Sequence, residues 1–95
     1  MIYRLILLMM FSVAGCGTHP ALYTPDDITA GRSPDEGPVL VYDDDHYYIG
    51  GVIAQLLADA GKAVTLVTPG PEVSCWTQNT MEQHRIEKAL LDRDV

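Results

Sequence analysis

The sequence VLVYDDDHYYIGGVIAQLLADAGKAVTLVT, from Val39 to Thr68, decides the fold. Its first four residues, Val39 to Tyr42, are aliphatic, β-branched or aromatic, which is typical of a strand covered on both faces. After Tyr42 the spacing of the apolar residues changes to that of a helix, which starts near Gly50. One face of this helix carries Val52, Ile53, Leu56, Leu57 and Ala60.

The end of this helix and the next strand are also marked. Gly61 is a natural stop, because glycine adopts the left-handed conformation without a steric clash of a Cβ atom. A second apolar run, Val64 to Val67, follows at once. Strand, helix and strand within about 30 residues form a βαβ unit, whose strands are parallel. We therefore predict an α/β protein with a partial Rossmann-like βαβα unit, preceded by a short apolar N-terminal segment.

Length, composition and charge restrict the function. The 95 residues allow one small domain, and a hydrophobic content of 47% argues against wholesale disorder. The net charge of −7 argues against nucleic acid as a partner, since phosphate binding requires clustered Lys and Arg. The two cysteines, Cys16 and Cys75, match no metal-binding spacing, and we expect no disulfide between them.

Three segments carry a resemblance to a known family. They are TPDDITAG, DDDHYYIGG and TLVTPGPEVSCWTQNTMEQHRIEKALL. Together they resemble the C-terminal part of the NADH:flavin oxidoreductases of the trimethylamine dehydrogenase type, over residues 17 to 95. The resemblance implies a parent enzyme with an FMN-binding barrel, a 4Fe-4S cluster and two nucleotide-binding-like domains. This chain resembles only part of the last region, so we predict a fragment of such an oxidoreductase, in the cytoplasm, with the remainder of the flavoenzyme as its partner. The resemblance implies that the parent is either an amine dehydrogenase or demethylase, or a relative of the dienoyl-CoA reductases.

The N-terminal segment, residues 1–16, has two interpretations. About a dozen apolar residues after Arg4 lead to Val13-Ala14-Gly15-Cys16, which looks like a bacterial lipoprotein signal and cleavage box. The chain would then be an exported lipoprotein or accessory nucleotide-binding module, anchored in the envelope through a lipid on Cys16. The alternative is a spurious start, which the family resemblance favours. In either case the apolar stretch is too short to span a bilayer stably.

Residues 17–38 are predicted to be a connector that contains a short helix. Thr24 is placed to cap it, Pro25 to occupy its first position, and Asp26 and Asp27 to lie at the positive end of its dipole. The glycines and prolines that follow limit this helix to about two turns. The Rossmann-like domain is then expected over residues 39–95.

The turn after the first strand lies where α/β proteins bind ligands. An ordinary dinucleotide fingerprint, G-x-G-x-x-G, would fall on Asp45, Tyr47 and Gly50, so only its last glycine is present. The missing glycines let a backbone approach a pyrophosphate, whereas Asp45 and Tyr47 add bulk and negative charge. Thr68 stands where a ribose-binding acid would follow the second strand. We therefore do not expect an NAD site of the ordinary type.

Two hypotheses remain for this turn. In the first it is a degenerate nucleotide site that binds an adenine nucleotide, or the corresponding part of FAD or NAD(P), weakly. Its candidate binding residues are Asp43, Asp44, Asp45, His46, Gly50, Gly51 and Thr68. In the second, Tyr47 and Tyr48 serve packing, and the acids stabilise the helix dipole.

Three consecutive acids also suggest Mg²⁺ or Ca²⁺, as in receiver domains of two-component signalling, a more remote alternative. A receiver requires an acceptor Asp at the end of a third strand, but residues 85 to 90 show a helical pattern instead. We therefore predict no metal site.

The C-terminal part shows no catalytic arrangement. Residues 72 to 78 read as an extended loop, with Cys75 as a loop thiol and Trp76 in core or interdomain packing. Asn79 and Glu82 have the spacing of a capping box, and a sparse apolar stripe then indicates a helix to about Leu91. No catalytic residue is assigned, and we expect no catalysis by the chain alone. Two parallel strands with unpaired outer edges predict marginal stability or aggregation.

Overall fold

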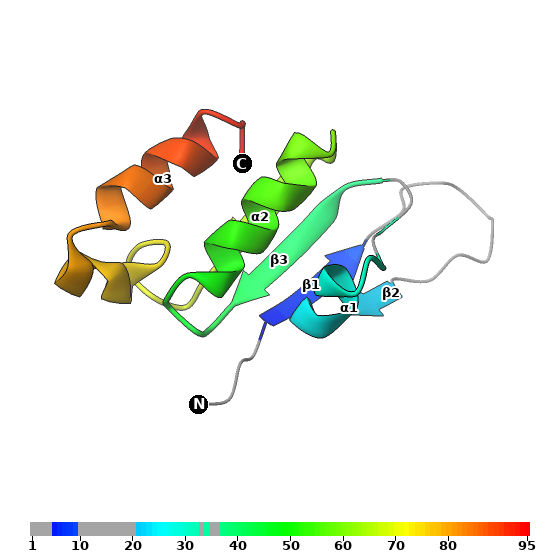
Figure 1. Cartoon of the computed structure of the whole chain (residues 1–95), viewed down its shortest axis with the longest axis horizontal. Coiled ribbons are helices and arrows are strands. Elements are labelled where there is room, and N and C mark those ends of the chain that lie inside the picture. Colours follow the sequence, from blue (N-terminus) through cyan, green and yellow to red (C-terminus); the bar gives the residue numbers. More distant parts are fainter. Residues whose placement is uncertain (1–4, 10–20, 33, 35–36) are drawn as a thin grey trace.

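A computed structural model of the chain describes residues 5–9, 21–32, 34 and 37–95. Strands and helices alternate along most of this sequence (Figure 1). In chain order the elements are β1 Leu5–Met9, β2 Ala21–Tyr23, α1 Pro25–Thr29, β3 Val39–Asp43, α2 Ile49–Asp59, β4 Val64–Val67, the 3₁₀ helix η1 Cys75–Thr80, and α3 Gln83–Leu91.

The four strands form one sheet in the order β2-β1-β3-β4. Strands β3 and β4 are parallel, with Val39 opposite Val64 and Tyr42 opposite Val67. Strand β1 is antiparallel to both β3 and β2. The predicted α/β class, with a partial Rossmann-like unit and parallel strands, is confirmed by β3, α2, β4 and α3.

The helices lie in front of the sheet in the view of Figure 1, with α2 across β3 and α1 beside β1. Helix α2 contacts β3, β4, α1 and α3, so it is the centre of the helical layer. Buried apolar side chains fill the space between the layers, and each valine, leucine or isoleucine among them contributes about 1.5–3 kcal/mol through removal from water. They are Ile28, Val39, Val41, Ile53, Ala54, Leu57, Val64 and Leu90.

The two faces of β3 differ in burial. Val39, Val41 and Asp43 are buried, whereas Leu40 and Tyr42 alternate with them and are only half-buried. Successive side chains of a strand point to opposite faces, so the first set faces the helices. The prediction of a strand covered on both faces is therefore met fully on the helix-facing side and only in part on the other side.

The N-terminal strand pairing was not predicted. Part of the apolar segment, Leu5–Met9, is β1 and pairs with β3 from Leu5 opposite Asp43 to Met9 opposite Val39. The expectation that both outer edges of the parallel pair are unpaired is therefore wrong, because β1 covers the edge of β3. The box Val13–Cys16, including the candidate lipidation site, lies outside the described residues.

The connector contains the predicted helix together with the short strand β2. Thr24 Oγ1 accepts a hydrogen bond from the Asp27 backbone N at 3.2 Å, and the Asp27 carboxylate accepts one from the Thr24 backbone N at 2.9 Å. This reciprocal capping box, with Pro25 in the first turn, confirms the predicted helix start. The backbone hydrogen bond from Thr24 is the main reason why the pKa of Asp27 is lowered.

The ends of the later helices follow the sequence less closely. Helix α2 starts at Ile49, one residue before the predicted start, and Gly61 follows it with a φ of 89°. The predicted capping box of Asn79 and Glu82 is wrong, because Asn79 lies inside η1 and α3 begins after Glu82 without a side-chain cap. The predicted extended loop over residues 72 to 78 is also partly wrong, because η1 begins at Cys75.

Among the described residues, none of the helices has the length and apolar character needed to cross a membrane.

Candidate functional site

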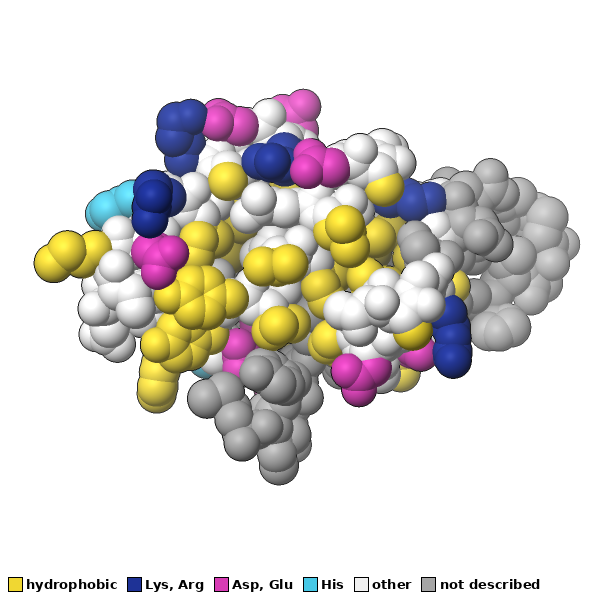
Figure 2. Space-filling model, in the orientation of Figure 1, with side chains coloured by type: hydrophobic (Ala, Val, Ile, Leu, Met, Phe, Trp, Pro, Cys, Tyr) yellow, Lys and Arg dark blue, Asp and Glu magenta, His cyan; other side chains and the backbone are white. Residues whose placement is uncertain are grey.

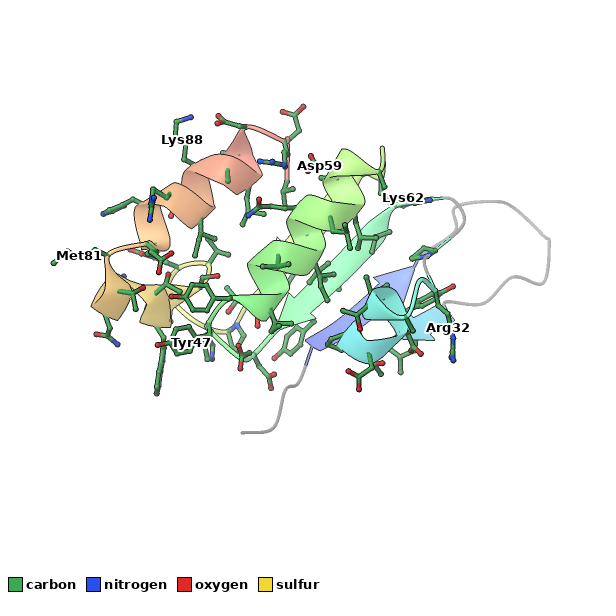
Figure 3. The ribbon with its side chains drawn as sticks, viewed as in Figure 1. Arg32, Tyr47, Asp59, Lys62, Met81 and Lys88 are labelled. Atoms are coloured by element: carbon green, nitrogen blue, oxygen red, sulfur yellow. The ribbon has the colours of Figure 1, made fainter. Side chains whose placement is uncertain are left out.

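The candidate residues meet at the carboxyl ends of β3 and β4. Asp43 is the last residue of β3, and Thr68 directly follows β4. Because the two strands are parallel and in register at Tyr42 and Val67, their ends lie side by side. The loop Asp44–Tyr48 connects this edge to α2, in front of the sheet in Figure 3.

Asp43 is turned inward and is fully buried. Its Oδ1 accepts a hydrogen bond from the Asp45 backbone N at 2.9 Å, and its carboxylate also accepts one from the His46 backbone N. Its Oδ2 has no hydrogen-bond partner among the described residues. Burial raises the pKa of Asp43, while the two backbone hydrogen bonds oppose this rise. The loop therefore closes around one of its own carboxylates.

Gly50 is the one fingerprint glycine that the chain retains, and its surroundings explain why a side chain is excluded. A Cβ atom added to Gly50 would overlap the Asp43 carboxylate and lie 2.7 Å from the Asp43 Cβ. The first turn of α2 thus packs directly on the end of β3. Close helix–strand packing is the usual role of the third glycine in this fingerprint.

His46 connects the loop to the segment after β4. Its φ of 65° is in the left-handed region, and its carbonyl accepts a hydrogen bond from the Trp76 backbone N at 3.0 Å. Its Nδ1 lies 3.5 Å from Thr68 Oγ1, which accepts a hydrogen bond from the Gly70 backbone N at 3.2 Å. A Cβ atom on Gly70 would lie 3.0 Å from His46 Nδ1 and 3.2 Å from Cys75 Sγ. The segment after β4 is therefore packed onto the loop.

Tyr47 and Tyr48 stack on each other, with their ring centroids 4.9 Å apart. Tyr48 lies 3.2 Å from Thr80 Oγ1 and donates a hydrogen bond to Glu82 at 2.7 Å. The hydrogen bond with Thr80 lowers the pKa of Tyr48, but the bond to Glu82 and the nearby negative charge raise it, and the net direction is upward. The hydrogen bond from the Tyr48 hydroxyl also lowers the pKa of Glu82. Tyr48 thus ties the start of α2 to the start of α3.

Gly51 follows Gly50 in the first turn of α2, but its Cβ direction faces other neighbours. A Cβ atom there would lie 3.1 Å from Ile86 Cγ2 and 3.5 Å from Ser74 Oγ. This glycine is buried against α3 and the segment before η1, so its role in the structure is packing. The structure therefore brings the seven candidate residues to the same end of the sheet, with the Cβ direction of Gly51 facing α3 instead of Asp43.

Three buried polar residues were not predicted. Thr77 Oγ1 donates a hydrogen bond to the Ser74 carbonyl at 2.6 Å, and Gln83 Nε2 donates to the Val73 carbonyl at 3.1 Å. Ser74 Oγ is buried and has no hydrogen-bond partner among the described residues. The spacing of apolar residues could not reveal these polar residues, because their burial depends on contacts of η1 and α3 with the rest of the fold. Trp76, expected in packing, is 58% exposed in this chain.

The chemistry of this site is limited by how its groups are used. The backbone N–H groups of Asp45 and His46 bond to Asp43, although such loop amides hold phosphate in ordinary dinucleotide sites. Asp44 and Asp45 place further acids beside them. In the described part of the chain, no group of three or more His, Cys, Asp or Glu side chains is arranged to hold a metal ion. Two amides of the loop are therefore already engaged by the chain's own carboxylate.

This fold and loop define a partial Rossmann-like α/β unit. The chain is similar to 6-hydroxypseudooxynicotine amine oxidase from Pseudomonas geniculata N1, with 42% identity and a TM-score of 0.73 over 75% of this chain. It is also similar to histamine dehydrogenase from Rhizobium sp. 4-9, with 50% identity and a TM-score of 0.71 over 77% of this chain. Both are trimethylamine dehydrogenase-like enzymes, so the resemblance seen in the sequence is confirmed.

The similarity covers a small part of each enzyme. The chain spans 11% of the amine oxidase and 12% of the histamine dehydrogenase. No protein-family model matches the chain, and the search of curated proteins found no significant match.

Proposed function

We propose that this chain is a segment of a flavin-dependent amine oxidoreductase of the trimethylamine dehydrogenase type, within its last nucleotide-binding-like domain. The observation that carries this proposal is the 42% and 50% identity, at TM-scores above 0.7, to an amine oxidase and a histamine dehydrogenase. In this proposal FMN and the 4Fe-4S cluster belong to the rest of the enzyme. The segment itself is structural and has no catalytic activity alone.

We further propose that the loop from Asp43 to Tyr48 is a degenerate nucleotide site. This proposal is supported by the buried Asp43 carboxylate, which accepts hydrogen bonds from the backbone N–H groups of Asp45 and His46. The carboxylates of Asp44 and Asp45 would also repel a diphosphate. Two like charges about 4 Å apart near a protein surface repel each other by about 4 kcal/mol. An adenine nucleotide would therefore bind weakly, and an NADH-linked role would depend on other parts of the enzyme.

A chimeric enzyme tests the main proposal. The segment of Rhizobium histamine dehydrogenase that matches this chain is replaced by the corresponding residues of this chain, and flavin content and histamine oxidation are measured. We expect a folded chimera that contains flavin and oxidises histamine. A soluble chimera without flavin or activity would contradict the proposal, provided that the unmodified enzyme prepared in parallel contains flavin.

The second candidate function, an exported lipoprotein or accessory nucleotide-binding module, rests on the Val13–Cys16 box. Cleavage before Cys16 would remove Leu5–Met9, which pairs with β3 along five residues. The pairing therefore supports a retained N-terminus and a cytoplasmic protein. Mass spectrometry of the chain produced in bacteria tests this choice. We expect an unprocessed N-terminus, whereas a chain that begins at a lipidated Cys16 would establish the alternative.

A further inference from the structure

Helix α2 is apolar on nearly all sides. Its only polar side chains are Gln55 and Asp59, in eleven residues. One side is buried against the sheet through residues that include Ile53, Ala54 and Leu57. A helix that is hydrophobic all round is normally enclosed by protein.

The opposite side of α2 is an apolar surface that we call the α2 stripe. It consists of Tyr48, Val52 and Leu56, which follow each other at intervals of four residues and so lie on one side of the helix. Their exposed fractions are 37%, 56% and 53%. Figure 2 shows hydrophobic side chains gathered across this face of the molecule, over α2.

Helix α3 provides the contrast. Most of its exposed positions are polar: they carry His84, Arg85 and Lys88, and the last two side chains are 81% and 75% exposed. Its one large exposed apolar side chain is that of its last residue, Leu91, which is 61% exposed and is not part of a row. Such charged side chains are typical of a helix face in water, whereas exposed aliphatic side chains in a row are not. The contrast between neighbouring helices indicates that the α2 stripe is an interaction surface.

The size and charge of the molecule argue for one occupant. The matched enzymes hold this unit within chains of which it forms 11% and 12%, so most of each enzyme lies outside the unit. A second copy is less suitable, because two chains of net charge −7 repel each other. The same charge disfavours a membrane of anionic lipid.

We infer that the α2 stripe docks an apolar surface of the remaining flavoenzyme, outside the matched segment. This inference rests on the proposed function and assigns the surface through which the segment joins its parent. In the assembled enzyme Val52 and Leu56 are buried, which completes the enclosure of α2. Tyr48 lies at the end of this interface, where its hydroxyl remains bound to Glu82.

The test uses the histamine dehydrogenase chimera with Leu56→Glu, and Met81→Glu as the matched control. Met81 is 89% exposed and points away from the rest of the molecule in Figure 3. We expect Leu56→Glu to lower the temperature of flavin release by about 5 °C or more, because it places an unpaired charge in a buried interface. Met81→Glu should leave this temperature unchanged. In the 95-residue chain alone, both variants should melt as the unsubstituted chain does.

The outcomes separate the inference from the proposed function. A chimera that contains flavin, and in which Leu56→Glu behaves as Met81→Glu does, would overturn the inference and leave the proposed function intact. A chimera without flavin would overturn both. As a second measurement, hydroxyl-radical oxidation of Leu56 should be at least about tenfold slower in the chimera than in the 95-residue chain, because oxidation requires solvent access. Equal rates would contradict burial.

Self-association is the remaining outcome. If light scattering shows that the 95-residue chain is a dimer, and Leu56→Glu makes it a monomer while Met81→Glu does not, the occupant is a second copy. That result would overturn the inference.

Discussion

The two ends of α2 both carry glycine, but for different physical reasons. At the amino end, Gly50 has a Cβ position that overlaps the Asp43 carboxylate. At the carboxyl end, Gly61 has a φ of 89°, and a Cβ atom there would meet nothing within 4 Å. The first glycine is required by packing and the second by backbone conformation. The amino end is therefore closely packed, whereas the carboxyl end is only a helix stop.

The largest expected effect is that of Gly50→Ala. The added methyl group must displace either the buried Asp43 carboxylate or the first turn of α2, and overpacking of this kind costs about 3 kcal/mol. Urea denaturation of the variant and the unsubstituted chain measures the difference in the free energy of unfolding. A loss below about 1 kcal/mol would show that the amino end is loosely packed and would remove the contrast between the two ends.

The next prediction concerns Asp43→Asn. The raised pKa of Asp43 means that its contribution to stability is fully present below the ordinary value of 3.8 and is lost as the pH rises through the folded-state pKa. The asparagine variant cannot titrate at this position. We expect the free energy of unfolding of the variant, relative to the unsubstituted chain, to increase as the pH rises through this window.

A pH profile unchanged by Asp43→Asn would mean that the carboxylate is hydrated, contrary to its complete burial.

Gly61→Ala should have a smaller effect than Gly50→Ala. A left-handed residue with a side chain costs about 1–2 kcal/mol, partly offset by the lower entropy of the unfolded alanine chain. We expect a net loss of about 1 kcal/mol in urea denaturation, and a smaller loss for Gly61→Asn because asparagine tolerates this conformation better. Equal losses for alanine and asparagine would mean that backbone conformation is not the reason for this glycine.

The smallest effect is expected for Tyr48→Phe at the amino end. Removing the hydroxyl removes the hydrogen bond that lowers the Glu82 pKa, so this pKa should rise in an NMR titration. The stabilising contribution of Glu82 is present above its ordinary value of 4.5 and is lost as the pH falls through the folded-state pKa. Tyr47→Phe is the control. An unchanged Glu82 pKa in Tyr48→Phe would remove this link between α2 and α3.

The strand–helix–strand unit could be predicted because its signals are local. The spacing of the apolar residues along the sequence identified β3, α2 and β4, and Thr24 with Asp27 marked the start of α1. The pairing of Leu5–Met9 with β3 was missed because it joins residues far apart in sequence, and an apolar N-terminal segment also fits a leader. The capping box at Asn79 was predicted wrongly. The side chain of Glu82 instead accepts a hydrogen bond from the Tyr48 hydroxyl.

The candidate site was only partly predictable for a related reason. The absence of two fingerprint glycines was visible in the sequence, and it indicated weak diphosphate binding. The inward orientation of Asp43 could not be predicted from the sequence, because each of the three consecutive acids is equally expected at the surface. Three-dimensional packing selects Asp43, which lies on the helix-facing side of β3 with Val39 and Val41. The burial of Ser74 and Gln83 likewise depends on contacts across the fold.

In the degenerate site that we propose, the chain's own Asp43 carboxylate accepts the loop N–H groups that would otherwise hold a cofactor's diphosphate. Isothermal titration calorimetry of the purified chain with ADP and with NADH, at equal concentrations and one pH, tests this most directly. We predict weak binding of ADP and no tighter binding of NADH. Stoichiometric, tight binding of NADH, or heat from NADH with none from ADP, would contradict the claim.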